Sequence, residues 1–293
     1  MATTDQSRVR NLVLVGKMNN GKRSTGNTIL GYEGFRAQNK YGLTVTSEMK
    51  QTYVGGYTLN MCVAMQLYVN PGLFYYNDKF GHASQEIAKC VDMAKEGIHA
   101  FIGVISTWFE FTEQEARAFK VLERLFGEKA LDYMILVVTC RKDEDADIDK
   151  FHKFYLPRAP QSLKDIVEKC QGRVLLFNNK TDDPERIKRQ QKDIVYTVNR
   201  EVLTHNKCRP FTNEYFKIAQ EEEKKRKEAE KKLREGNIDL TIYNETKRKL
   251  ETQRQEVMKG MTEKIKIQIV EELKKETSGS SKKPLEDSCC SIL

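Results

Sequence analysis

The clearest chemical pattern in the chain lies between residues 16 and 24. Gly16 is followed by four residues and then by Gly21 and Lys22, between an apolar run at 12–15 and a helix-like stretch at 25–30. This is the strand–loop–helix setting of a phosphate-binding loop, where backbone N–H groups, a helix N-terminus and a lysine surround a phosphate chain. The predicted phosphate-binding residues of this loop are Gly16, Asn19, Asn20, Gly21, Lys22, Arg23 and Ser24.

The loop departs from the usual motif at Arg23. A Ser or Thr normally follows the lysine, and its hydroxyl binds magnesium. Ser24 is a poor replacement, because one further residue along a helix turns the side chain by about 100°. The Arg23 guanidinium can instead make charge-assisted hydrogen bonds to a phosphate. We therefore predict phosphate binding with a doubtful need for Mg²⁺, and we assign no protein ligand to a metal.

Other parts of a guanine-nucleotide site follow in order along the chain. Thr44 stands where a switch threonine senses the terminal phosphate, and Gly72 follows an apolar strand at the position that meets the same phosphate. The carboxylate expected just before Gly72 is replaced by Val69. Asp143 follows a later strand and is placed to accept the N–H donors of guanine, while Asn179 closes the last strand where a loop packs over the base.

Val69 and Arg23 together remove both groups that would hold magnesium. Phosphoryl transfer depends on a metal that bridges the phosphates and on a positioned water. We therefore expect turnover to be reduced by orders of magnitude, and we assign no catalytic residue.

Short apolar runs that alternate with helix-like stretches predict an α/β fold, with a mainly parallel P-loop GTPase-type sheet and helices on both faces. Thr112 and Glu115 have the spacing of a capping box at the start of a helix. The expected strands are 12–15, two within 52–69, 102–105, 135–138 and 174–177, and the expected helices are 84–95, 112–126, 163–169 and 183–203.

Composition predicts four regions: a loose N-terminus at 1–9, a nucleotide-binding domain at 10–206, a charged helical extension at 207–276, and a flexible tether at 277–293. Thirteen of the fifteen residues from Glu221 to Glu235 are charged, which cannot build a core. A thin apolar stripe beyond Gly236 fits a solvated helix that folds back on the domain, or a coiled-coil surface for a partner.

The last four residues begin with Cys290 and fit a prenylation motif, and the adjacent Cys289 is a candidate for palmitoylation. A chance cysteine is the alternative. No apolar run is long enough to cross a bilayer, so any membrane attachment is expected to be peripheral or covalent. The seven Cys residues contain no C-x-x-C pair, which favours reduced thiols in the cytosol. Fifty basic against 42 acidic residues is mixed charge and argues against nucleic-acid binding.

The chain resembles the GIMAP/IAN family of AIG-type nucleotide-binding GTPases, which are related to the Toc GTPases and septins. The most specific match is the box from Gly97 through Thr112 and Glu115 to Gly127. The match covers roughly residues 10–203, and the charged extension and prenylation-type end suit a plant-like member. Family members usually carry Gly, Ser and Asp where this chain has Asn19, Arg23 and Val69.

The resemblance implies a GTP/GDP-binding domain, with guanine contacts from Asp143 and Asn179, that self-associates across its nucleotide face. Together with the prenylation-type end, the resemblance implies a lipid-anchored assembly or regulatory module on the cytosolic side of a membrane such as the endoplasmic reticulum, with a cytosolic pool and a link to immunity. Weak or absent hydrolysis is the leading hypothesis. An active GTPase completed by dimerisation and a nucleotide-free scaffold are the alternatives.

Overall fold

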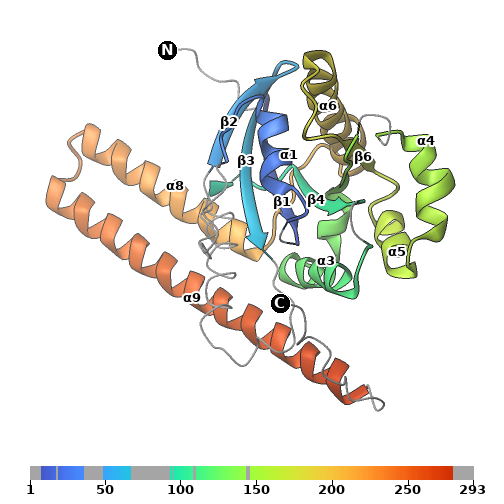
Figure 1. Cartoon of the computed structure of the whole chain (residues 1–293). Helices are drawn as coiled ribbons and strands as arrows, with labels where there is room; N and C mark the ends of the chain where they lie inside the picture. Colours follow the sequence, from blue (N-terminus) through green and yellow to red (C-terminus); the bar gives the residue numbers. More distant parts are fainter. Residues whose placement is uncertain are drawn as a thin grey trace, which may run out of the picture.

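The computed structural model describes residues 8–17, 19–35, 49–66, 93–94, 96–107, 110–142 and 146–279. They form a six-stranded sheet of order β2-β3-β1-β4-β5-β6 (Figure 1). β2 pairs antiparallel with β3, and the other neighbours pair in parallel, which confirms the predicted fold class. The strands are β1 Val9–Gly16, β2 Met49–Val54, β3 Tyr57–Gln66, β4 Ala100–Ser106, β5 Met134–Thr139 and β6 Val174–Phe177.

β1 lies inside the sheet, and its Leu12 pairs with Met61 of β3 on one side and with Ala100 of β4 on the other. Residues 11–16 are all buried, as in a parallel strand that is covered on both faces. The chain order reverses beside β1, and the C-terminal ends of the parallel strands meet at one edge. This is where open α/β sheets bind ligands.

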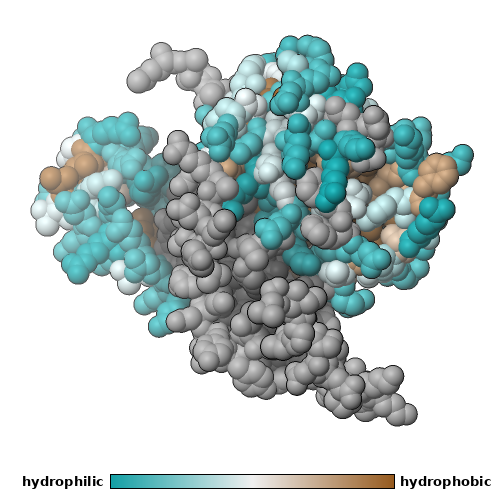
Figure 2. Space-filling model, viewed as in Figure 1, coloured by the Kyte–Doolittle hydropathy of each residue, from teal (hydrophilic) through white to brown (hydrophobic). Residues whose placement is uncertain are grey.

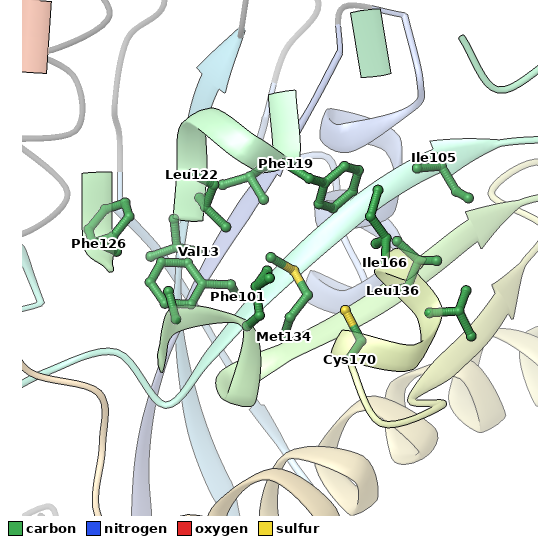
Figure 3. Packing of buried hydrophobic residues seen from close by; sticks show 14 of the residues in the cluster. Val13, Phe101, Ile105, Phe119, Leu122, Phe126, Met134, Leu136, Ile166 and Cys170 are labelled. Atoms are coloured by element: carbon green, nitrogen blue, oxygen red, sulfur yellow. The ribbon is translucent and has the colours of Figure 1, made fainter. Parts of the chain in front are cut away.

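Helices cover both faces of the sheet (Figure 1). On one face, Ile29 and Ile194 pack with Leu14 and Ile102 in a buried apolar cluster. On the other face, Phe119 joins the residues that Figure 3 shows around Phe101. The helical elements of these two layers are α1 Lys22–Leu30, α6 Pro184–Tyr196, η7 Thr197–Val202 and α7 Leu203–His205 on the first, and α3 Glu113–Phe126, η3 Glu128–Tyr133 and α5 Gln161–Lys169 on the second.

A helical segment after β5 was not predicted. It comprises α4 Ile148–Lys150, the π-helical η5 Phe151–Tyr155 and η6 Leu156–Arg158. The Asp147 side chain begins it by accepting hydrogen bonds from two backbone N–H groups, and Phe151 is buried while its ring stacks on Tyr155. Three helix types in eleven residues have no single hydrophobic period, which explains why periodicity does not reveal the segment.

The hydrophobic core continues beyond residue 206, where composition predicts the end of the domain. Phe211 forms an antiparallel bridge with Ile98 and packs edge-on against Phe101, with ring centroids 5.5 Å apart. Phe216, in the first turn of the next helix, is fully buried in the same cluster. The helical extension is therefore fixed to the domain through aromatic side chains.

The extension is a helical hairpin of α8 Glu214–Arg234 and α9 Leu240–Gly279 (Figure 1). The predicted break at Gly236 is present, with a φ of 72° at that glycine. The two helices pack together, and α9 also contacts α3, as expected for a helix that folds back. The visible surface of the described part of the hairpin is mainly hydrophilic in Figure 2. Within the described ranges, no helix is long and apolar enough to span a bilayer.

Candidate functional site

The loop between β1 and α1 has the backbone of a phosphate-binding loop. Gly16 ends the strand, Asn19 adopts a left-handed φ of 67°, and Gly21 caps the helix with a φ of 91°. Asn tolerates this conformation better than most residues, so the exchange of Gly for Asn19 leaves the loop shape intact. The loop leads directly into the N-terminus of α1, where unpaired N–H groups favour an anion.

Gly16 is required by a close approach of two backbones. A Cβ atom added there would lie 2.4 Å from the carbonyl oxygen of Val104 in β4, and the φ of 144° is unfavourable for other residues. The first glycine of the loop thus lets β1 and β4 approach each other at the edge of the sheet.

The Lys22 ammonium folds back over the loop. Its Nζ donates hydrogen bonds to the carbonyl oxygens of Gly16, at 2.8 Å, and Lys17, at 2.7 Å. Burial, and secondarily the neighbouring charge of Arg23, lower the pKa of Lys22 to about 7. An anion bound beside Lys22 would compensate the charge of this ammonium.

Arg23 and Ser24 differ in their setting. Arg23 is half-buried at the start of α1, whereas Ser24 is exposed and the next residue, Thr25, is fully buried. Ser24 therefore lies on the outer side of the helix, in agreement with the predicted turn away from the loop interior. At the position that normally supplies a magnesium-binding hydroxyl, this chain presents a guanidinium, which cannot ligate a cation.

Polar side chains from elements distant in sequence form hydrogen bonds with the loop. The Asn20 Nδ2 donates to the Glu115 carboxylate at 2.7 Å and lies 3.3 Å from the carbonyl oxygen of Val104. The hydroxyl of Thr139, the last residue of β5, lies 3.2 Å from the carbonyl oxygen of Asn20. Glu115 and Asn20 are both buried, so these contacts are shielded from water.

Glu115 has two functions that the capping-box prediction did not combine. Its Oε2 accepts a hydrogen bond from the backbone N–H of Thr112 at 2.9 Å and so caps α3, as predicted. Its Oε1 meets Asn20. No spacing pattern in the sequence signals the contact between Glu115 and Asn20.

Asn179 lies behind the same loop, at the end of β6. Its amide contacts the hydroxyls of Thr25, at 3.0 Å, and Thr28, at 2.9 Å, both in α1. The adjacent Asn178 is buried, and its side-chain oxygen accepts from the backbone N–H of Lys180. The structure thus brings Asn179 to the predicted edge of the sheet, but directs its side chain to α1.

His99, in the box that carries the family resemblance, is a structural residue. Its Nδ1 accepts a hydrogen bond from the backbone N–H of Asn11 at 3.0 Å, which requires a neutral ring. Burial, followed by the charge of Arg10, lowers the pKa of His99 to about 4. The site predictions at Thr44, Val69, Gly72, Asp143, Cys289 and Cys290 lie outside the described residues.

The loop between the first strand and the first helix is flanked by two glycines and contains a buried lysine, and the sheet is mainly parallel. These features define a P-loop-type α/β protein. A model of the AIG1 family matches residues 10–231. The chain belongs to this family, which confirms the resemblance seen in the sequence.

Two relatives from Arabidopsis thaliana illustrate the match. Immune-associated nucleotide-binding protein 9 is 33% identical over 226 residues, which cover 76% of this chain and 64% of that protein. Immune-associated nucleotide-binding protein 1 is 32% identical over 204 residues, which cover 70% of this chain and 88% of that protein. The chain thus spans slightly less than two thirds of the first relative and most of the second.

Solved structures of Toc33 from Arabidopsis thaliana also align with the fold. The complex with GDP and Mg²⁺ gives a TM-score of 0.48 at 17% identity, covering 66% of this chain and 86% of that one. A dimerisation-deficient mutant of Toc33 gives a TM-score of 0.49 at 18% identity, with the same coverage.

Proposed function

We propose that this chain binds GTP or GDP at the loop between β1 and α1, and hydrolyses GTP weakly or not at all. The observation that carries the proposal is the Lys22 ammonium, held 2.7–2.8 Å from two loop carbonyls at the N-terminus of α1. Phosphate oxygens are better partners for an ammonium than carbonyls are, and they match the partial positive charge of the helix end. The relatives named as nucleotide-binding proteins support a nucleotide as the source of the phosphates.

Weak hydrolysis follows from the groups around the phosphates. The residues of the described loop do not fit Mg²⁺, because Arg23 is a cation and the exposed Ser24 lies on the outer side of α1. Arg23 instead supplies positive charge to the phosphates through its N–H groups. Charge of this kind supports binding, but it does not position the attacking water that hydrolysis needs.

Isothermal titration of the full chain with GDP, in Mg²⁺ and in EDTA, tests this function. We expect binding in both buffers, with affinities that agree within about threefold, and loss of binding in Lys22→Met. Absence of binding at millimolar GDP in both buffers would contradict the proposal and favour a nucleotide-free scaffold. Multiple-turnover phosphate release at a rate typical of active GTPases would instead favour an enzyme completed by dimerisation.

The double variant Arg23→Ser with Val69→Asp tests the interpretation of the two altered positions. It restores a hydroxyl and a carboxylate where related loops use them on magnesium, so binding should become dependent on Mg²⁺. The single variants serve as controls, since neither restores the pair. Unchanged magnesium dependence in the double variant would contradict the assigned roles.

We further propose that the protein acts as an assembly or regulatory module, which self-associates and is attached to the cytosolic side of a membrane through lipids on Cys290 and Cys289. One lipid gives only marginal anchoring, so a second lipid or self-association is needed for stable attachment. Mass spectrometry of the C-terminus from native tissue tests the modification, and Cys290→Ser should move the protein from membrane to soluble fractions. An unmodified C-terminus would refute the lipid anchor, and the proposal of nucleotide binding would be unaffected.

A further inference from the structure

Asn179 has both ends of its side-chain amide engaged by α1. One polar atom lies 3.0 Å from the Thr25 hydroxyl and the other lies 2.9 Å from the Thr28 hydroxyl. The Thr28 hydroxyl also lies 3.0 Å from the carbonyl oxygen of Ser24, so its one proton is shared between that carbonyl and the amide oxygen of Asn179. Thr25 is fully buried and Asn179 is partly exposed, so their contact lies at the boundary of the buried interior.

The amide also packs directly behind the phosphate loop. A Cβ atom added to Gly21 would lie 3.5 Å from Nδ2 of Asn179 and 3.3 Å from Cγ2 of Thr139. Gly21 is the residue that caps α1, and Thr25 is in its first full turn. The segment after β6 therefore lies near the last residue of the loop and contacts the helix that would face the phosphates.

A second contact joins the same parts of the fold. The Gln191 side chain of α6 donates to the carbonyl oxygens of Thr28, at 3.3 Å, and Ile29, at 3.2 Å. α1 is thus contacted by Asn179 at Thr25 and Thr28, and by Gln191 of α6 at Thr28 and Ile29. Rotation of the Asn179 side chain toward a base would break both of its hydrogen bonds to α1.

We propose that Asn179 is a positioning residue, which fixes the phosphate loop and the first turn of α1, and does not read the guanine base through its side chain. The proposal rests on the proposed function in that a nucleotide occupies the loop. Selectivity for the base then depends on other groups. Loss of the Asn179 amide should weaken the binding of every nucleotide that places phosphates in the loop.

The test uses three variants of the full chain. Asn179→Ala removes the amide, and Thr28→Val removes one of its partners on α1 with little change in shape. Asp182→Ala is the matched control, because Asp182 is exposed and lies in the same connection after β6. GDP and ADP affinities are measured by titration, and hydrogen exchange of residues 16–25 is measured without nucleotide.

We expect Asn179→Ala and Thr28→Val to lower the affinities for GDP and for ADP by the same factor, about tenfold. The ratio of the two affinities should stay as in the wild type, and exchange in residues 16–25 should rise in both variants. The control should change neither. A selective loss of GDP affinity in Asn179→Ala, with Thr28→Val unaffected, would overturn the proposal and restore Asn179 as a base reader.

The exchange measurement separates this inference from the proposed function. If the wild type binds neither nucleotide, the proposed function fails, and exchange alone decides the role of Asn179. Unchanged exchange of residues 16–25 in Asn179→Ala would then refute it. If Asn179→Ala does not fold, Thr28→Val, which keeps the amide, carries both measurements.

Discussion

The side-chain nitrogen of Asn20 lies 2.7 Å from the carboxylate of Glu115, although 95 residues separate them in the chain. Asn20 belongs to the phosphate loop and Glu115 to the first turn of α3. The second carboxylate oxygen of Glu115 caps that helix through the backbone N–H of Thr112. One buried side chain therefore joins the loop to the start of α3, and α3 in turn contacts α9 of the C-terminal hairpin.

Replacing Glu115 by Ala should destabilise both ends of this connection. The Asn20 amide loses its carboxylate acceptor and the Thr112 N–H loses its cap, so we expect the free energy of unfolding to fall by about 2–4 kcal/mol. Thr112→Ala is the control, because it keeps the Glu115 carboxylate on Asn20 and should cost about 1 kcal/mol or less. Urea denaturation measures both, and equal losses would contradict a role for Glu115 in holding the loop.

Lys22→Met should change the pH dependence of stability. Below pH 7 the ammonium is charged in both states, and its burial in the folded state costs free energy in full. Between about pH 7 and the ordinary value of 10.5, the unfolded chain binds more protons than the folded one, so this cost declines as pH rises. The stability of Lys22→Met minus that of the wild type should therefore be largest below pH 7 and decrease toward pH 10. A difference that is independent of pH would contradict the lowered pKa.

Nucleotide binding should be accompanied by proton uptake near pH 8. A phosphate beside Lys22 favours the ammonium form and raises its pKa above the value of about 7 in the empty loop. Titrations with GDP in two buffers of different ionisation enthalpy measure the number of protons taken up. At pH 6, where the ammonium is already protonated, the uptake should vanish or turn into a net release, because the terminal phosphate of GDP titrates at about pH 6 and loses its proton beside the ammonium.

Gly16→Ala should be far more harmful than Gly56→Ala. Both glycines have positive φ, but a Cβ at Gly16 meets the backbone of Val104, whereas nothing lies within 4 Å of one at Gly56. We expect Gly56→Ala to cost about 1 kcal/mol from backbone strain alone, and Gly16→Ala to cost about 3 kcal/mol or more, because backbone atoms must move. Thermal unfolding compares them, and similar losses would argue against a close approach of β1 and β4.

Phe216→Ala should destabilise the α/β domain itself. Phe216 is fully buried beside Phe211 in the core, so its truncation should cost about 3–5 kcal/mol. Ile242→Ala, at a residue that is 49% exposed on α9, should stay within about 0.5 kcal/mol of the wild type. If Phe216→Ala instead melts α8 by circular dichroism without lowering the unfolding midpoint of the sheet, the extension is not part of the core.

Much of the fold follows from local patterns in the sequence. Short apolar runs mark β1, β4, β5 and β6, because a strand buried on both faces must be apolar throughout. Gly16, Gly21 and Lys22 mark the loop, because its backbone angles and its charge require those residue types. The helical segment from Ile148 to Arg158 cannot be predicted from local patterns, since it changes helix type within eleven residues and keeps no single hydrophobic period.

The sequence by itself determined the class of fold, the position of the phosphate loop and the replacement of the magnesium-binding hydroxyl by Arg23. These are properties of one strand, one turn and one helix, and local geometry dictates them. Only the tertiary structure decided what holds the loop in place. Glu115 contacts the loop from α3, and Asn179 contacts α1 from the end of β6; a hydrogen bond between residues 95 or 154 positions apart leaves no local period or spacing in the sequence. Parallel strands that end at one edge bring such residues together, and burial makes their polar groups pair.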